Sequence, residues 1–357
     1  MSELFAPIEL RGLRLDNRIV VSPMCQYSAV DGCVGDWHLM HLGQFAVSGA
    51  GMLIVEMTNV EARGRISPRC VGLYDDDNER AFARVLDFCR RHSDMAIGVQ
   101  LAHAGRKAST LPPWQGRDAL APGDGGWQTV SASAIGASDR SPLPAALSRA
   151  EVGALVDAFA SAARRAHRLG FDAIELHGAH GYLLHQFLSP LSNQRDDDYG
   201  GSLENRMRFP LQVYDAVRAE WPDDKPLGMR ISATDYLAGG WRIEDSVALG
   251  RLLKERGCDW IDVSSGGIAA GEKISVGPGY QVPFAEQIRQ QTGLTTMAVG
   301  LITEARQAEA IVANGQADMV ALARGMLYDP RWPWHAAAEL GAEVAYPNQY
   351  LRCQPHQ

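Results

Sequence analysis

The sequence lacks the features that mark membrane, secreted and nucleic-acid-binding proteins. No run of about 18 apolar residues occurs among its 357 residues, so no transmembrane helix is expected. The first ten residues, MSELFAPIEL, lack the basic and apolar regions of a signal peptide. The formal net charge is −8 and long basic runs are absent, so nothing favours binding to nucleic acid.

Cysteine is scarce and dispersed, and there is neither a CxxC pair nor a small disulfide-rich scaffold. The six cysteines are Cys25, Cys33, Cys70, Cys89, Cys258 and Cys353. Reduced thiols in a cytoplasmic protein are therefore expected. The run Asp196, Asp197 and Asp198 cannot turn three consecutive carboxylates to one point, so it predicts a solvated loop and no metal site.

Short apolar runs alternate with helical patterns along most of the chain. The runs cover 19–24, 52–55, 96–101, 173–176, 227–231, 260–263, 296–299 and 319–322. Helical patterns cover 148–169, 244–256 and 303–314, and in the first of these Ser148 and Glu151 form a capping-box pattern. Each of the three stops at a glycine, and an aspartate follows shortly before the next apolar run.

This alternation predicts an α/β fold with a parallel sheet. Eight strands suit a (β/α)8 barrel, and we expect the whole chain, 1–357, to form one such domain with a C-terminal tail at 340–357. An open doubly wound sheet is the alternative, although no G-x-G-x-x-G follows the first strand. The segment 103–147, rich in Pro, Gly and Ser, leaves the third strand and is expected to cover the barrel mouth.

Polar side chains at the strand ends predict a reaction centre, because the C-terminal ends of barrel strands converge on one face. We expect seven such residues to face one cavity: Cys25, Tyr27, Gln100, His177, His180, Tyr182 and Arg230. Arg230 interrupts an apolar run. A buried arginine without a partner is costly, so this residue should face an anion or an electron-rich ligand.

The loops after the seventh and eighth strands predict a phosphate site. Gly300 precedes a helix that starts at Thr303, and Ala323, Arg324 and Gly325 follow the eighth strand. The spacing of His177 and His180 also allows a metal pair on one helix face, although no third ligand lies nearby in the sequence. From these residues alone, a structural and a functional role for the histidines both stay open.

Five segments resemble the Old Yellow Enzyme family of FMN-dependent ene-reductases, in its bacterial subclass with YqjM and xenobiotic reductase A. They are NRIVVSPMCQY (17–27), VQLAHAGRKA (99–108), ELHGAHGYLLHQFLSPLSNQRDDDYGGSLENRMRF (175–209), AVGLIT (298–303) and ALARGMLYDP (321–330). The resemblance covers nearly the whole chain. It implies a (β/α)8 barrel that holds non-covalent FMN across its C-terminal mouth.

The resemblance also implies roles toward the flavin. The residues that match flavin contacts are Ser22, Pro23, Met24, Cys25 and Met57 beside the ring, Gln100 and Arg230 at its pyrimidine side, and Gly300, Ala323 and Arg324 at the phosphate. Met57 stands where the family usually has alanine, and its larger side chain could crowd the ring. Ala323 stands where glycine is common, but its backbone N–H is retained.

The implied reaction begins with hydride transfer from NADPH or NADH to the flavin and ends with reduction of the C=C bond of an enone or enal. His177 and His180 match the residues that bind the substrate carbonyl oxygen, Tyr182 matches the proton donor, and Tyr27 matches a pocket residue. Arg352 resembles an arginine that reaches a neighbour's active site, so a homodimer or homotetramer is expected. A flavin-binding barrel with another electron acceptor and a metal-dependent hydrolase that uses the histidine pair are the alternatives.

Overall fold

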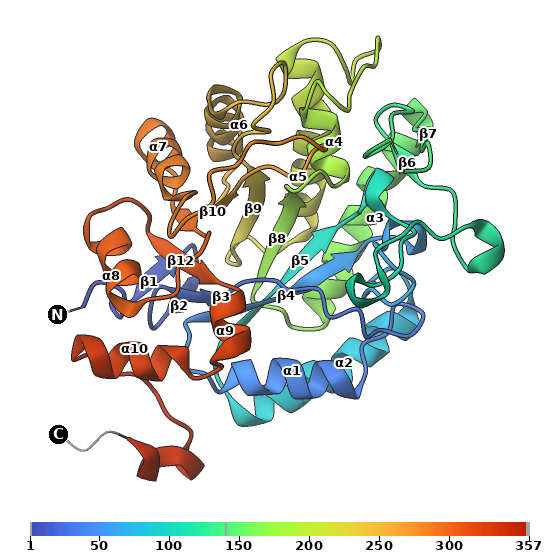
Figure 1. The fold of residues 1–357 in the computed structure, drawn as a ribbon. Coiled ribbons are helices and arrows are strands. Elements are labelled where there is room, and N and C mark those ends of the chain that lie inside the picture. The colour runs from blue at the N-terminus through green and yellow to red at the C-terminus, as the bar shows by residue number, and fades with distance from the viewer. Residues whose placement is uncertain (1, 140, 355–357) are drawn as a thin grey trace.

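A computed structural model of the chain describes residues 2–139 and 141–354. Eight parallel strands close into a barrel in the order β10-β11-β12-β3-β4-β5-β8-β9 (Figure 1). The barrel strands are β3 (Ile19–Val21), β4 (Met52–Asn59), β5 (Ala96–Ala102), β8 (Ala173–Gly178), β9 (Leu227–Ser232), β10 (Trp260–Ser264), β11 (Thr296–Ala298) and β12 (Met319–Leu322). The predicted barrel is confirmed, and the eight apolar runs correspond to its eight strands.

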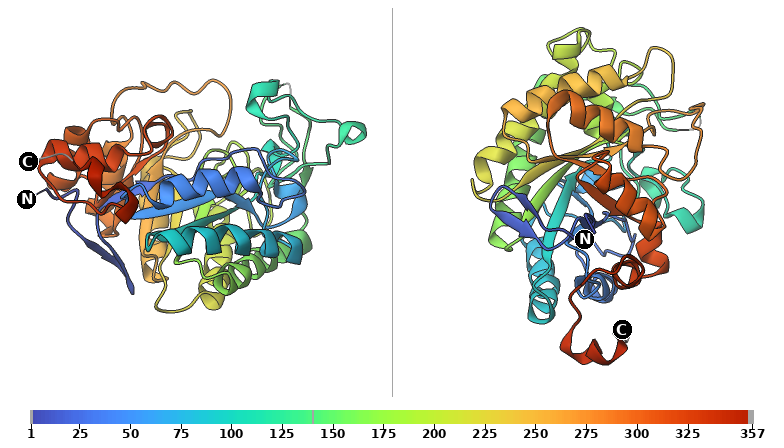
Figure 2. Two further views of the ribbon diagram at one scale, coloured as in Figure 1. Left: turned by 90° about the horizontal axis from the view of Figure 1, so that it is seen from below. Right: turned by 90° about the vertical axis from the view of Figure 1, so that its left-hand side faces the viewer.

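Helices surround the barrel (Figures 1 and 2). They are α1 (Asp36–Ala46), α2 (Asp76–His92), α3 (Arg149–Arg168), α4 (Leu183–Leu188), α5 (Leu203–Glu220), α6 (Ile243–Glu255), α7 (Val282–Thr292), α8 (Ala305–Ala313), α9 (Arg324–Tyr328) and α10 (Trp332–Leu340). The capping box of α3 is present, because the Ser148 side chain accepts the N–H of Glu151 and the Glu151 carboxylate accepts the N–H of Ser148. None of the described helices is long and apolar enough to cross a membrane.

The aspartate that recurs before three strands has a common structural role. The carboxylates of Asp172, Asp259 and Asp318 accept the backbone N–H groups of Ile97 (2.7 Å), Leu227 (2.8 Å) and Thr296 (2.9 Å), respectively. Each donor lies at or near the start of the neighbouring, preceding barrel strand. The aspartate therefore satisfies an N–H group that would otherwise be unpaired at the N-terminal end of the barrel.

A short antiparallel hairpin at the N-terminus, β1 (Ile8–Leu10) and β2 (Leu13–Leu15), was not predicted from the sequence. Leu10 and Leu15 are almost fully buried and pack with inward-facing barrel residues that include Met52, Trp260 and Met319. The hairpin thus seals the apolar interior, and its three-residue strands are too short to show a hydrophobic period.

The described part of the excursion, 103–139 and 141–147, contains no long element. It consists of 3₁₀ turns at Gly105–Lys107, Pro113–Gln115 and Pro122–Asp124 and of the paired strands β6 (Val130–Ser131) and β7 (Ala145–Ala146). It projects from one end of the molecule, whereas both chain termini lie toward the other end (Figure 2).

Candidate active site

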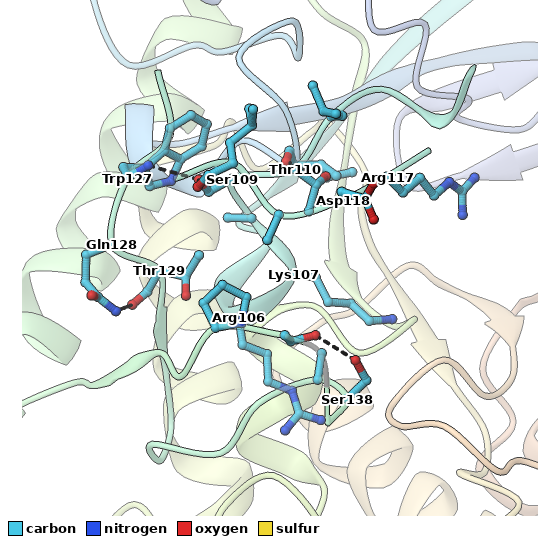
Figure 3. Close-up of a pocket in the computed structure, with 18 of the residues that line it drawn as sticks. Arg106, Lys107, Ser109, Thr110, Arg117, Asp118, Trp127, Gln128, Thr129 and Ser138 are labelled. Carbon is cyan, nitrogen blue, oxygen red and sulfur yellow. Dashed lines mark hydrogen bonds between the residues drawn. The ribbon is translucent and has the colours of Figure 1, made fainter. Parts of the chain in front are cut away.

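A cavity of about 810 Å³ lies between the excursion and the barrel (Figure 3). Tyr27 and Tyr182 line it from the barrel side, and residues 106–111, 117–122 and 127–129 line it from the excursion. Of the seven residues expected to share one cavity, these two tyrosines line this one. His177 packs against both Tyr182 and His180, while Gln100 and Arg230 are buried inside the barrel, so the expectation is met only in part.

Two basic residues attach the excursion to the loop after β10. The Arg106 guanidinium donates to the carbonyl oxygens of residues 135, 136 and 268. The Lys107 ammonium donates to the carbonyl oxygens of His180 (2.7 Å) and Gly267 (2.5 Å), and burial lowers the pKa of Lys107 to about 8. Because carbonyl groups hold both cations, these side chains brace the cavity wall.

His177 and His180 lie at the C-terminal end of β8, with their ring centroids 5.1 Å apart. Burial and the nearby Arg230 charge hold the pKa of both imidazoles well below the usual range. The Nδ1 atom of His177 accepts the N–H of Ala179 at 3.2 Å. A neutral ring that accepts at Nδ1 carries its proton on Nε2, so His177 can donate one hydrogen bond into the site.

Tyr182 stands beside this pair as the residue that precedes α4. Its ring centroid lies 5.0 Å from that of His177. Burial raises the pKa of the Tyr182 phenol well above its usual range, and the Cys25 side chain adds to this effect. The phenol therefore stays protonated, and its hydroxyl has no hydrogen-bond partner in the described part of the chain. It is free to donate to a ligand.

The loop after β3 carries Cys25 and Tyr27. Tyr27 has a left-handed backbone, with φ of 49°, and the preceding turn is held by a hydrogen bond from the N–H of Gln26 to the Glu56 carboxylate at 2.9 Å. Burial first, and the Glu56 carboxylate second, raise the pKa of the Cys25 thiol well above its usual value. Sequence reasoning missed Glu56, which is buried at 3 % exposure although it lies in an apolar strand.

Met57 follows Glu56 and is 2 % exposed. Its side chain packs in a small apolar cluster with Ile66, Cys70, Ala102, Ala104 and Ala108, against which Cys25 also packs. The larger residue at this position is thus accommodated by small neighbours inside the cluster.

Arg230 is not an unpaired buried charge, which corrects the premise drawn from the sequence. Its Nη1 donates to the Ser22 hydroxyl at 3.1 Å, and its Nε lies 3.3 Å from the Asp262 carboxylate. Asp262 is the cross-strand neighbour of Arg230 in the β9–β10 register, which places the two charges side by side.

A second cross-strand pair completes this buried polar layer. Gln100 opposes Glu175 in the β5–β8 register, and its amide donates to Glu175 at 2.8 Å. The Trp260 indole N–H donates to the other carboxylate oxygen at 3.3 Å. Burial and the Asp262 charge raise the pKa of Glu175 to about 8. Sequence reasoning missed Glu175 and Asp262, although a charged residue inside an apolar run, the signal used for Arg230, marks both.

The two loops predicted to bind phosphate follow adjacent strands, β11 and β12. Gly300 has φ of 123°, and a Cβ there would lie 2.8 Å from the Gln281 side chain, so a larger residue does not fit. Ala323 precedes α9, and Arg324 is its exposed first residue. No hydrogen bond or ion pair engages the Arg324 side chain within the described residues, which leaves its charge available to an anion.

The metal-site alternative has no donor set in residues 2–139 and 141–354, where no three His, Cys, Asp or Glu side chains gather in a geometry suited to a metal. Arg352 lies in the exposed C-terminal turn Asn348–Cys353 and is not among the residues that line the cavity. Whether it serves a neighbouring subunit stays a prediction.

Comparison with known proteins identifies the family of the chain. The model of the NADH:flavin oxidoreductase / NADH oxidase family matches residues 3–343. The chain is 47% identical to an NADPH dehydrogenase of Geobacillus thermodenitrificans over 351 residues and 43% identical to one of Bacillus subtilis over 352 residues, and each alignment covers 98% of both chains. Morphinone reductase superposes with a TM-score of 0.80 at 29% identity, covering 97% of this chain and 92% of that one. A further structure of morphinone reductase contains tetrahydroNAD.

The family match and the two NADPH dehydrogenase relatives show an NAD(P)H-dependent flavin oxidoreductase, and the closed parallel barrel fits that class. The chain belongs to the NADH:flavin oxidoreductase family, which is the Old Yellow Enzyme family.

Proposed function

We propose that the protein is an FMN-dependent ene-reductase that uses NADPH or NADH to reduce the C=C bond of α,β-unsaturated carbonyl compounds. The observation that carries this proposal is the packing of His177 against His180 and Tyr182, with ring centroids 5.1 and 5.0 Å apart, beside the 810 Å³ cavity that Tyr182 lines. Hydrogen-bond donors and a proton donor are the groups that such a reduction requires.

The residues inside the barrel mouth fit the flavin of FMN. Gln100 turns its amide nitrogen toward Glu175, which leaves its carbonyl oxygen without a partner in the described part of the chain and able to accept a ring N–H. Arg230 supplies positive charge at the pyrimidine side, and Ser22, Pro23, Met24, Cys25 and Met57 would lie beside the ring. Gly300, Ala323 and Arg324 would hold the phosphate. On this proposal, residues 1–357 form a single FMN-binding domain.

Bound FMN would supply the redox chemistry, which is acceptance of a hydride from the nicotinamide and its delivery to the β-carbon of the unsaturated compound. His177 and His180 would donate hydrogen bonds to the substrate carbonyl oxygen and stabilise the negative charge that develops there. Tyr182 would then donate its phenolic proton to the α-carbon, and Tyr27 would bound the pocket. In the homodimer or homotetramer that we propose, Arg352 would reach the site of a neighbouring subunit.

The test is an absorption spectrum of the purified protein, followed by anaerobic NADPH and then cyclohexenone. A yellow protein that bleaches with NADPH and recovers with the enone is expected. If the colour bleaches but the enone does not restore it, the flavin stands and the electron acceptor is another compound. A colourless protein that cannot be reconstituted with FMN would overturn the proposal.

A further inference from the structure

The segment Ser264–Gly267 has no role in the proposed function, although its position at the end of a barrel strand marks it in the sequence. In the structure it surrounds His180. The Ser264 hydroxyl lies 2.7 Å from Nε2 of His180. At the other end of the segment, a Cβ on Gly267 would lie only 2.7 Å from the Cα of His180, so the glycine permits this close approach.

The backbone of His180 is held in an uncommon conformation by the same segment. Its φ of 58° lies in the left-handed region, which a non-glycine residue keeps only where its surroundings fix it. The N–H of His180 donates to the Ser232 hydroxyl at 2.9 Å, and that hydroxyl donates to the carbonyl oxygen of Gly266 at 2.7 Å. The His180 and Gly267 carbonyl oxygens share the Lys107 ammonium. Ring and backbone are therefore positioned together.

Gln281 lies behind the ring and contacts both serines of the segment. Its amide nitrogen donates to the carbonyl oxygen of Val299 at 2.9 Å, so its amide oxygen faces the two serines. The Ser265 hydroxyl, which accepts the Tyr236 hydroxyl at 3.0 Å, donates to this oxygen at 2.5 Å. The Ser264 hydroxyl has two acceptors for its single proton, this oxygen at 3.3 Å and Nε2 of His180 at 2.7 Å. A carbonyl ligand decides between them, because only donation to Nε2 leaves the other ring nitrogen of His180 protonated and able to donate to the ligand.

We propose that Ser264, oriented by Gln281 and Ser265, sets the tautomer of His180 by donating its hydroxyl proton to Nε2, which places the imidazole proton on Nδ1. His177 then has the opposite tautomer, because its Nδ1 accepts the Ala179 N–H and its proton lies on Nε2. Both rings present a donor to the ligand. In the reverse arrangement, the His180 Nδ1 would present a lone pair to a carbonyl oxygen and repel it. Ser264 is thus a positioning residue.

This inference rests on the proposed function for its ligand, the substrate carbonyl oxygen, but its primary test needs no turnover. Protein labelled with ¹⁵N-histidine and loaded with FMN would be studied by long-range ¹H–¹⁵N correlation, which separates protonated from unprotonated ring nitrogens. His180 is expected as the Nδ1–H form and His177 as the Nε2–H form. A spectrum of His180→Asn would assign the signals.

His185 provides an internal reference in the same spectrum. Its Nδ1 accepts the N–H of Gly181 at 2.9 Å, and its Nε2 lies 2.9 Å from the Asp235 carboxylate. It should stay in the Nε2–H form in every variant. In Ser264→Ala, His180 is expected to gain the Nε2–H form, whereas Ser264→Thr, which keeps the hydroxyl, should retain the Nδ1–H form. The KM for cyclohexenone should rise about tenfold in Ser264→Ala, as loss of one hydrogen bond to the ligand predicts.

A wild-type spectrum with His180 in the Nε2–H form would overturn the inference, and so would an unchanged His180 tautomer in Ser264→Ala. The wild-type spectrum is decisive even if the alanine variant does not fold. If the tautomers are as expected but the enone is not reduced, the proposed function fails and the positioning role stands. If the enone is reduced but His180 has the other tautomer, only the positioning role fails.

Discussion

At the scale of single residues, the site depends on side chains that stay in one protonation state near neutral pH. Burial lowers the pKa of His177 and His180 and raises the pKa of Tyr182. On the proposed function, the two imidazoles would act as neutral donors, and the phenol would keep its proton until a substrate takes it. In that proposal, the histidines polarise the substrate carbonyl and Tyr182 protonates the α-carbon, so different residues carry out the two tasks.

Removal of the Tyr182 hydroxyl should affect the two half-reactions differently. In Tyr182→Phe we expect reoxidation by cyclohexenone to slow by about 100-fold, within the range for loss of a general acid. Reduction by NADPH needs no such proton and should change little. Stopped-flow absorbance would measure both rates. Tyr199→Phe removes an equivalent hydroxyl, which contacts Gln212 at 3.2 Å, and should leave both unchanged. Equal reoxidation rates in Tyr182→Phe and the wild type would show that another group donates the proton.

The buried carboxylate Glu175 should make stability depend on pH. Its pKa is about 8 in the folded protein, against about 4.3 in an unfolded chain, so its contribution is present below pH 4.3 and lost as pH rises toward 8. Glu175→Gln removes this titration and keeps an acceptor for Gln100. As pH rises from 5 to 9, the free energy of unfolding of the variant should increase relative to that of wild type by on the order of a few kcal/mol.

Thermal unfolding of the FMN-loaded proteins at the two pH values would measure that gain. Glu255→Gln, at the exposed end of α6, is the matched control and should show none. If the stability of Glu175→Gln changed between pH 5 and pH 9 as much as that of wild type, a group other than Glu175 would be responsible for the pH dependence. The sequence marks Glu175 as a charge inside an apolar run, but its partner Gln100 could not be predicted, because strand register sets their pairing rather than sequence distance.

At the scale of secondary-structure elements, the sequence predicted the barrel strands well because each is buried and apolar. The two largest differences are at the ends of β3 and β4. β3 stops at Val21 rather than at residue 24, and β4 continues to Asn59 rather than stopping at residue 55. The extension carries Glu56, Thr58 and Asn59, which are buried polar residues that an apolar-run criterion excludes. The hairpin β1–β2 was not predicted because its strands are only partly buried over three residues, whereas the equally short β3 and β11 are buried throughout.

The aspartate at the entry to β12 should be important for stability. Asp318 accepts the N–H of Thr296 and pairs with Arg289 at 3.0 Å. Asp318→Ala leaves both donors without an acceptor, so we expect a loss of about 2 kcal/mol in the free energy of unfolding. Urea titration would measure it. Asp94→Ala, at an exposed loop position, should change stability by less than about 0.5 kcal/mol. A similar small effect for Asp318→Ala would show that solvent replaces its contacts.

At the scale of the whole molecule, the position of the excursion was predictable but the geometry of the cavity was not. Segment 103–147 leaves the C-terminal end of β5, so barrel topology alone places it near the mouth. The cavity also depends on Arg106 and Lys107, whose carbonyl partners lie up to 162 residues away along the chain. Contacts at such separations follow from the packed fold and leave no local signal in the sequence.

The C-terminal tail leads to a prediction about the assembled protein. Tyr346 and Tyr350 pack on Trp334 of α10, with ring centroids 4.5 and 6.1 Å away, and the tail lies toward the end of the molecule opposite the excursion. Arg352 does not line the cavity of its own chain, so any role in substrate binding requires a second copy. Arg352→Ala should therefore raise the KM for cyclohexenone, by about tenfold for one lost charged contact, while FMN content is unchanged.

Hybrid oligomers would distinguish action across subunits from action within one. Arg352→Ala subunits would be mixed with an excess of Tyr182→Phe subunits, each with a different affinity tag, and the hybrid isolated. If Arg352 acts in a neighbour, the Arg352→Ala subunit receives an intact arginine from its partner while keeping its own Tyr182, so sites with wild-type KM are regenerated. If Arg352 acts within its own chain or not at all, no hybrid site combines both residues, and the KM of the hybrid stays that of the Arg352→Ala protein. In the first case, dilution to monomers should abolish the recovery of the wild-type KM, because the shared site exists only in the assembly.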